Sequence, residues 1–401
     1  MSKVFIVGAK RTAIGTFGGA LKEIPANRLG AHVIKAAMQH ANVKPDMIDE
    51  TIMGNVLSAG QGMGPGRQAA IYAGIPVEKA AYSVNILCGS GMKSVMIGST
   101  DIKAGEAQIV AAGGMESMSM APYMIPSAAR FGMKFGNGQI FDHMIVDGLT
   151  DVFNNYHMGV TAENIARKYS LSRKEQDDFA LASQQKAKQA IESGRFSDEI
   201  VPYELKVKKD VVYFAKDEHP RYDTTADSLA KLRPAFLSDG TVTAGNASGI
   251  NDGASALILA GEEAVEKYGL KPLAEIVSYA QAGVDPSVMG LGPYPAIKKA
   301  LEKSGLNLKD IQLLELNEAF AAQSLGVIKE LCEAYSLSKE WIMERTNVNG
   351  GAIALGHPIG ASGNRIIVSL LYEMKKRSLS FGLASLCIGG GMGTAVLIKN
   401  L

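Results

Sequence analysis

The chain has 401 residues, of which 47% are hydrophobic and 20% charged, the composition of an ordinary globular protein. Because a single hydrophobic core stops growing at about 250 to 300 residues, two or more substructures are expected. Its 41 basic and 40 acidic residues nearly cancel and no dense basic run occurs, which argues against nucleic acid or an anionic membrane as the main partner and favours a small ligand.

The three cysteines, Cys88, Cys332 and Cys387, are odd in number and widely spaced. This pattern fits neither a disulfide framework nor a thiolate zinc site, so we expect free thiols, a reducing cytoplasmic location and no metal centre. The apolar run at residues 4–7 is too short for a secretory signal, and no stretch is apolar enough over a sufficient length to span a bilayer.

Short β-rich apolar runs alternate with helical patterns through the first 118 residues. The last strand of this part is expected to end in Gly113-Gly114-Met115-Glu116. Alternation of this kind predicts an α/β architecture. Strands are predicted at 4–8, 50–55, 82–87 and 108–112, and helices at 28–42 and 92–102.

The same order of elements returns late in the chain. A glycine pair precedes Met392 as one precedes Met115, and Asn317 holds the place that Asn55 holds earlier. These echoes predict a duplication. Strands are predicted at 274–280, 311–316, 382–387 and 393–398, and helices at 295–303, 319–334 and 364–376.

Residues 119–249 interrupt this order and read as an insertion that covers the mouth of a pocket. A long helix is predicted at 173–193, because Ser172 and Glu175 form a capping box and Gly194 supplies a C-terminal stop. The expected domains are therefore a first half at 1–118 and 250–270, the insertion, and a second half at 271–401.

Two glycine-rich turns carry the first candidate catalytic residues. Cys88 lies at a strand-to-helix junction, where unpartnered amide N–H groups and the helix dipole would stabilise a thiolate nucleophile. The alternative is a small apolar side chain buried at a tight turn. His357 would occupy the equivalent helix N-terminus in the second half and could accept the thiol proton, although a lone histidine in such a turn is more often structural.

A third turn begins at Cys387, which precedes three glycines whose amides could bind an oxyanion. A second sulfur suits removal of a proton from carbon; the alternative is a cysteine that faces the core. Cys332 lies among apolar residues of a predicted helix and is assigned to the core. Asn317 is either the N-cap of the helix that follows it or a polar group that orients a water or a substrate carbonyl.

Together these motifs resemble the thiolase family, specifically its short-chain biosynthetic acetoacetyl-CoA thiolases. The resemblance runs essentially end to end, from Lys10-Arg11-Thr12-Ala13-Ile14-Gly15 through Asn317-Glu318-Ala319-Phe320 and Asn347-Val348-Asn349-Gly350-Gly351 to the turn at Cys387. It implies the α/β thiolase fold, in which two duplicated βαβαβαββ halves form a five-layered αβαβα core and a loop domain is inserted in the first half.

The resemblance also assigns roles. Cys88 would accept the acetyl group, His357 would activate it, and Cys387 would move the proton at the α-carbon of the second substrate. One oxyanion hole would comprise His357 and a water held by Asn317, and the other the amides of Cys88 and Gly389.

Coenzyme A contacts are implied in and beside the insertion. The set is mostly apolar, which suits a pantetheine arm, with one cation for the nucleotide phosphates, and three bulky members (His157, Met158 and Met289) would restrict the acyl pocket to short chains. Its members are Leu149, His157, Met158, Arg221, Ser228, Phe236, Ala244, Ser248, Met289, Ala319 and Phe320.

The implied reaction is a reversible ping-pong Claisen condensation of two acetyl-CoA molecules to acetoacetyl-CoA and CoA, without a tightly bound cofactor. A degradative 3-ketoacyl-CoA thiolase of broader chain length is the alternative. Asn317 with Cys387 argues against a β-ketoacyl synthase, which uses two histidines, and a non-catalytic acyl-CoA-binding protein is a further rival. A homotetramer, built as a dimer of dimers, is implied, with no nucleic acid or membrane partner.

Overall fold

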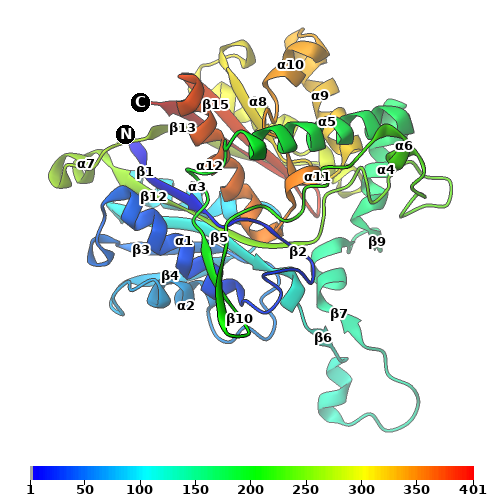
Figure 1. Cartoon of the computed structure of the whole chain (residues 1–401), viewed down its shortest axis with the longest axis horizontal. Helices are drawn as coiled ribbons and strands as arrows, with labels where there is room; N and C mark the ends of the chain where they lie inside the picture. The colour runs from blue at the N-terminus through cyan, green and yellow to red at the C-terminus, as the bar shows by residue number, and fades with distance from the viewer. Residues whose placement is uncertain (1–2) are drawn as a thin grey trace.

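The computed structural model describes residues 3–401, and its centre is one large mixed sheet (Figure 1). Nine strands follow one another in the order β14-β15-β16-β13-β1-β12-β5-β3-β4, and β2 pairs with β12 as the tenth. These strands are β1 (Val4–Arg11), β2 (Gly15–Thr16), β3 (Glu50–Gly54), β4 (Ala80–Val84), β5 (Ile109–Ser117), β12 (Asn251–Gly261), β13 (Ala274–Gly283), β14 (Leu313–Leu316), β15 (Phe381–Ile388) and β16 (Met392–Asn400).

Two similar halves meet at the centre of this sheet. β1 pairs with β13 through only two antiparallel residue pairs, Phe5 with Glu275 and Ile6 with Ala274. On each side of this junction the order is antiparallel strands first and parallel strands at the edge, since β3 pairs in parallel with β4 and β5, and β14 pairs in parallel with β15. The predicted duplication of element order is confirmed.

Helices cover the sheet on both outer faces and fill the space between the halves. The helices of the two halves are α1 (Ala26–Ala41), α2 (Pro65–Tyr72), α3 (Ser90–Ala104), α7 (Glu262–Tyr268), α8 (Pro293–Ser304), α9 (Ala321–Tyr335), α10 (Lys339–Arg345), α11 (Ala352–Leu355) and α12 (Ile359–Arg377). In α12, sixteen of nineteen residues are buried, which is expected only of a helix with protein on every side.

Three apolar clusters define five layers. One cluster joins α1 and α2 to the outer face of the first half, and another joins α8 and α9 to the outer face of the second. The central cluster packs α3 and α12 against strands of both halves. Alternation along β1 explains the arrangement, because Ile6 faces the central layer while Phe5 and Val7 face α1. The five-layered αβαβα prediction is confirmed.

Most element boundaries follow the predictions, with two informative differences. The strand predicted at 82–87 ends at Val84, because the chain there turns toward the start of α3. The helix predicted from 364 begins at Ile359, with Pro358 as its N-cap. Glycines in its first turn concealed this start, since glycine ordinarily disfavours helix.

The glycine echo between the halves was wrong. Gly113 and Gly114 lie inside β5, where they pair with Ala256 and Ser255, and form no turn. Gly390 and Gly391 instead make the hairpin between β15 and β16 with φ angles of 80° and 88°. The glycines of β5 serve close packing rather than a turn.

That close packing occurs where α12 crosses β5 and α3. A Cβ on Gly114 would lie 2.2 Å from the carbonyl oxygen of Gly360, and one on Gly363 would lie 2.6 Å from the amide nitrogen of Met92. A Cβ on Gly91 would lie 2.9 Å from the amide nitrogen of Asn364. Backbone therefore touches backbone at this crossing, and a side chain has no room.

We expect Gly114→Ala to lower the free energy of unfolding by about 2 to 3 kcal/mol, because the obstructing atoms are backbone and cannot rotate away. Urea denaturation followed by circular dichroism measures the change. Gly283→Ala is the matched control, since a Cβ there would find its nearest atom at 3.8 Å. Equal stability of the two variants would contradict the close-contact explanation.

The chain between β5 and β12 lies outside the large sheet. It contains α4 (Met158–Tyr169), α5 (Arg173–Glu192) and α6 (Ala226–Ala230), a π-helical turn (Met144–Leu149), and three two-stranded sheets. The predicted capping box of α5 is confirmed, with Ser172 and Glu175 bonded reciprocally. The small sheets pair β6 (Tyr123–Met124) with β7 (Phe141–Asp142), β8 (Thr150–Asp151) with β9 (Tyr156–His157), and β10 (Tyr203–Val207) with β11 (Asp210–Phe214).

Part of this segment projects from the body as an arm. Residues 123–141 extend away from the sheet (Figure 1) and expose large apolar side chains. Such a surface on a globular protein marks an interaction site. Its exposed apolar residues are Tyr123, Ile125, Phe131, Met133, Phe135, Ile140 and Phe141.

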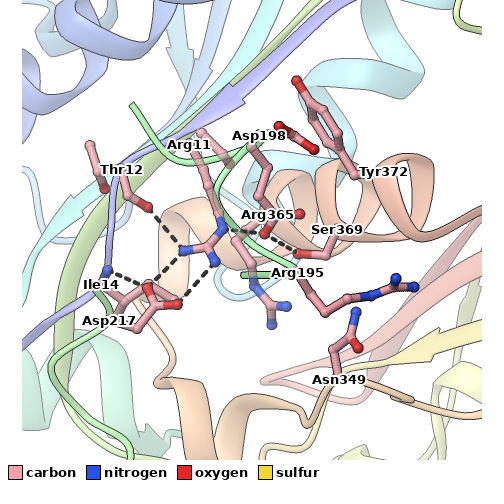
Figure 2. Close-up of polar contacts among 12 residues, drawn as sticks. Arg11, Thr12, Ile14, Arg195, Asp198, Asp217, Asn349, Arg365, Ser369 and Tyr372 are labelled. Atoms are coloured by element: carbon pink, nitrogen blue, oxygen red, sulfur yellow. Dashed lines mark hydrogen bonds and ion pairs between the residues drawn. The ribbon is translucent and has the colours of Figure 1, made fainter. Parts of the chain in front are cut away.

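A buried ion-pair network ties the rest of the segment to β1 (Figure 2). The guanidinium of Arg11 is fully buried; its Nε lies 2.5 Å from Glu199 Oε1, and its Nη1 and Nη2 lie 2.7 and 3.0 Å from the two oxygens of Asp217. The two carboxylates raise the pKa of Arg11 despite its burial. Asp217 also accepts the amide of Ile14, so this part of the segment is fixed to the core.

The single tryptophan lies on the short helix α10, to which the sequence assigned no role. Trp341 lies in α10, packs against the core cluster of the second half, and is covered by the guanidinium of Arg345 at 4.1 Å from the ring centroid. Ser338 caps this helix by accepting the amide of Trp341 at 3.1 Å.

Every helix between residues 3 and 401 is too short or too polar to traverse a lipid bilayer.

Candidate active site

Cys88 and His357 hold equivalent places in the two halves. Cys88 directly precedes Gly89, the N-cap of α3, and His357 directly precedes Pro358, the N-cap of α12. Since these two helices cross at their first turns, both side chains are brought to the middle of the molecule. The predicted equivalence is confirmed.

The loop of Cys88 interlocks with the hairpin that follows Cys387. Leu87 has a φ of 55°, a left-handed conformation that is unusual for a residue with a side chain and that turns the chain sharply into Cys88. A Cβ on Gly389 would lie 2.8 Å from Cδ1 of Leu87, and one on Gly89 would lie 2.3 Å from Cδ1 of Ile388. The glycines therefore allow the two cysteine loops to touch.

Burial makes both thiols weak acids. The pKa of Cys88 is raised to about 11 by burial, against the opposing effect of the Gly389 amide and of its own. Burial also raises the pKa of Cys387, and the neighbouring Cys88 raises it further. The expectation that the helix N-terminus stabilises a Cys88 thiolate was wrong for the protein without substrate, because the desolvation cost exceeds the contribution of the amides.

His357 is held as a neutral base. Burial, and to a smaller extent the positive charge of Arg365, lower its pKa to about 3. Ser362 Oγ lies 2.6 Å from Nδ1 and 3.0 Å from the carbonyl oxygen of Pro358, which can only accept. Both contacts are hydrogen bonds when the hydroxyl donates to the carbonyl and Nδ1–H donates to the hydroxyl, which leaves the lone pair on Nε2.

The backbone of His357 is fixed by Asn251 at the start of β12. Asn251 Oδ1 accepts the His357 amide at 2.8 Å, and its Nδ2 donates to the carbonyl of Gly15 at 3.0 Å. Gly356 has a φ of 101°, and a Cβ there would overlap the Asn251 amide at 2.6 Å. The histidine loop is thus clamped to the first half.

Asn317 is not a helix cap. α9 begins four residues later, at Ala321, with Phe320 as its N-cap. Both side-chain polar atoms of Asn317 are buried and have no hydrogen-bond partner among residues 3–401. Since buried amides are normally bonded, this side chain is suited to hold a water or a substrate group.

A cavity of about 490 Å³ leads from the surface to His357. Seven of the eleven implied coenzyme A contacts line it: Leu149, His157, Arg221, Phe236, Ala244, Ser248 and Phe320. Cys88 packs in one apolar cluster with Leu149, Ile250 and Ile359, which are also cavity wall. Cys88, Cys387 and Asn317 do not themselves line the cavity, so the cavity connects to Cys88 only through these shared wall residues.

A smaller cavity of about 200 Å³ shares Arg221 and Ala244 with the first, and Ser228 lines it. The remaining three implied contacts, Met158, Met289 and Ala319, line neither cavity. They are buried in one cluster with Phe320 and Cys387, so they form the apolar backing of the site.

The sequence analysis missed His219, which lines both cavities. Burial and the nearby charge of Arg221 lower its pKa to about 4, so the ring is neutral at physiological pH. Its position two residues before Arg221, an implied coenzyme A contact, was the feature of the sequence that could have predicted it. Thr16 and Phe17, from the first half, also line the larger cavity. No local pattern in the sequence predicts this, because only the folded chain brings them there.

No group of three or more His, Cys, Asp or Glu between residues 3 and 401 is arranged to hold a metal ion.

Comparison with known proteins shows the family. Residues 4–263 match the family description "Thiolase, N-terminal domain" and residues 270–400 match "Thiolase, C-terminal domain". An "Acetyl-CoA acetyltransferase" of Syntrophomonas wolfei is 55% identical over 401 residues, covering 100% of this chain and 99% of its own. The chain therefore belongs to the thiolase family.

Solved structures are similarly close. The Bacillus anthracis acetyl-CoA acetyltransferase is 47% identical with a TM-score of 0.95, covering 100% of this chain and 99% of its own. Human mitochondrial 3-ketoacyl-CoA thiolase in complex with CoA is 46% identical with a TM-score of 0.93, covering 100% of this chain and 98% of its own. The fold is the thiolase fold.

Because its pKa is raised to about 11, Cys88 should hold less thiolate at every pH below 11 than an ordinary cysteine. We expect its alkylation by iodoacetamide, without substrate, to keep accelerating from about pH 7 to about pH 10. Mass spectrometry of the Cys88 peptide measures the rate. A synthetic peptide of residues 85–91 is the control, whose rate should level off near about pH 9. A plateau for the protein below about pH 8 would refute the resting neutral thiol.

Proposed function

We propose that the chain is an acetyl-CoA acetyltransferase that condenses two acetyl-CoA molecules to acetoacetyl-CoA and CoA, and catalyses the reverse thiolysis. The observation that carries this proposal is the 490 Å³ cavity lined by His357, together with the interlocked loops of Cys88 and Cys387. A thioester carbonyl bound beside His357 would meet one base and two sulfurs. Relatives over half identical across the full chain bear the name acetyl-CoA acetyltransferase.

In the first half-reaction Cys88 is the nucleophile and His357 the base. The neutral Nε2 takes the thiol proton as Sγ forms a bond to the acetyl carbonyl carbon of acetyl-CoA. The carbon–sulfur bond to CoA then breaks, and the CoA thiolate leaves with the proton from His357. Since burial disfavours charge on both Cys88 and His357, proton transfer and bond formation are coupled rather than sequential.

In the second half-reaction Cys387 gives its thiol proton to the neutral His357 and then, as thiolate, removes a proton from the methyl group of a second acetyl-CoA. The enolate attacks the acetyl carbon on Cys88, the bond to Cys88 Sγ breaks to release acetoacetyl-CoA, and Cys88 takes the proton back from His357. His357 and a water on Asn317 would stabilise the enolate oxygen, and the amides of Cys88 and Gly389 the tetrahedral oxyanion. One such donor contributes about 3 to 4 kcal/mol to transition-state stabilisation.

Coenzyme A thioesters are the proposed substrates, and no tightly bound cofactor takes part. The apolar wall of Leu149, Phe236 and Phe320 suits the pantetheine arm, while Arg221 and Ser228, at the second cavity, suit the phosphate-bearing end. His157, Met158 and Met289 limit the acyl group to short chains, supported by the tight burial of both methionines. A broader 3-ketoacyl-CoA thiolase is the alternative, because the similar human structure bears that name.

A homotetramer in the cytoplasm is part of the proposal. Its support is the exposed apolar arm at 123–141 and the edge strand β4, which has one hydrogen-bonded neighbour in the described sheet. The proposed domains are a first half at 1–118 and 250–270, a loop domain at 119–249 that supplies most of the cavity wall, and a second half at 271–401. Nucleic acid and membranes are not proposed partners.

Steady-state kinetics with acetyl-CoA, acetoacetyl-CoA and longer 3-ketoacyl-CoA thioesters test the function in both directions. We expect turnover with acetyl-CoA alone and a kcat/KM for acetoacetyl-CoA at least about tenfold above that for the six-carbon homologue, because each of its two extra methylenes would change selectivity by about 1 to 3 kcal/mol. A requirement for malonyl thioester would indicate a synthase. Equal kcat/KM across chain lengths would indicate the broad thiolase.

Cys387→Ala should separate the half-reactions. Acetylation of Cys88 by acetyl-CoA should persist, because it uses His357, while condensation and thiolysis fall by about two to four orders of magnitude with loss of the acid-base group. Intact-protein mass spectrometry measures the first and spectrophotometry the second. Cys88→Ala is the control that abolishes both, and Cys332→Ala the control that affects neither. Equal loss of both half-reactions in Cys387→Ala would mean that Cys387 has another role.

A further inference from the structure

His157 caps the helix that borders the substrate cavity. It is the N-cap residue of α4, and its Nδ1 accepts the backbone amide of Gly159 at 3.0 Å. An amide N–H can only donate, so Nδ1 carries a lone pair and the ring proton is on Nε2. Histidine is uncommon at this position, where Ser, Thr, Asp or Asn normally accept the bond without any dependence on pH near neutrality.

The same ring is part of the cavity wall. It stacks on Phe236 with ring centroids 4.6 Å apart and an angle of 21°, and Phe236 meets Phe320 edge to face at 6.1 Å. His157, Phe236 and Phe320 all line the 490 Å³ cavity. Gly159 completes the contact, since a Cβ there would lie 2.2 Å from the Phe236 ring. The helix cap and the substrate wall are one group of side chains.

The start of α4 also reaches the catalytic loops. Met158, the first residue of the helix, packs with Cys387, and its Cε lies 2.4 Å from where a Cβ on Gly389 would be. A change in the first turn of α4 therefore moves the wall beside both the pantetheine arm and the Gly389 amide.

No charged neighbour holds a proton on this ring. Burial lowers the pKa of His157, without a contribution from a nearby charge. The titratable groups on the same cavity wall are His219, Arg221 and His357. The carboxylates on the flanking elements are bonded elsewhere, Asp151 to Phe153 and Asn154, and Glu163 to Thr241 and Val242.

Resting on the proposed function, we propose that His157 is a positioning residue that works only as a neutral imidazole, so that its protonation weakens the binding of coenzyme A and its thioesters. A proton on Nδ1 removes the acceptor of the Gly159 amide and places a cation at the positive end of α4. The released first turn no longer holds the cavity wall. The loss occurs as pH falls, because the neutral form is the one that caps.

The test compares His157→Asn and His157→Ala with the wild-type enzyme. We expect the wild-type KM for acetoacetyl-CoA in thiolysis to rise about fivefold or more between about pH 7.5 and about pH 5, with a smaller change in kcat. Asparagine accepts the same amide and does not titrate, so the KM ratio between the two pH values should stay within about twofold. Alanine cannot cap, so its KM should be raised about fivefold at both pH values alike.

A low-pH rise in KM of equal size in His157→Asn and wild type would overturn the proposal, because another group would then titrate. Calorimetric titration of free CoA into the Cys88→Ala variant, with and without the second substitution His157→Asn, measures binding in the absence of turnover. There the dissociation constant should depend on pH only when His157 is present. If the wild type fails to cleave acetoacetyl-CoA at every pH, the proposed function fails, while these titrations still decide the role of His157.

Discussion

The direct backbone contact between α3 and α12 is the constraint on which the site depends. Both helices are buried in the central layer, and they approach so closely that Gly91 and Gly363 each leave no space for a Cβ, while Gly114 of β5 leaves none against α12. Since Cys88 and His357 directly precede the N-caps of these helices, the distance between the helices fixes the distance between the two side chains. The proposed nucleophile and its base thus come from positions 269 residues apart without a flexible loop between them and the core.

The same burial that gives this precision suppresses charge. Cys88, Cys387 and His357 are all driven toward their neutral forms, because none has a partner that offsets desolvation. A permanent thiolate–imidazolium pair would be costly here, whereas an oxyanion that forms on a bound thioester meets amide donors already in place. The neutral resting state is therefore consistent with electrostatic preorganisation for the reacting state.

Features that depend on a local pattern or on a long motif could be predicted from the sequence. The alternation of strands and helices, the capping box at Ser172 and the equivalence of Cys88 and His357 followed from it. It misled where glycine serves packing, because a Gly-Gly pair inside β5 is locally indistinguishable from a turn. It also could not give the pKa of Cys88 or the presence of His219 and Thr16 in the cavity, since both depend on which distant residues surround an atom.

The insertion completes the site without belonging to its rigid centre. Arg11, Glu199 and Asp217 bind one part of it to β1 through buried charges, whose removal singly would leave an unpaired ion and cost about 3 to 5 kcal/mol. The part that lines the cavity, between Leu149 and Gly159, is held instead by apolar stacking and one capped helix end. The positions of the proposed catalytic residues are thus set by closely packed helices whose contacts run through glycine. The proposed substrate affinity depends instead on the cavity wall, which is held more weakly and can change independently of those helices. Chain-length preference can therefore change through the wall residues while the positions of Cys88 and His357 stay the same.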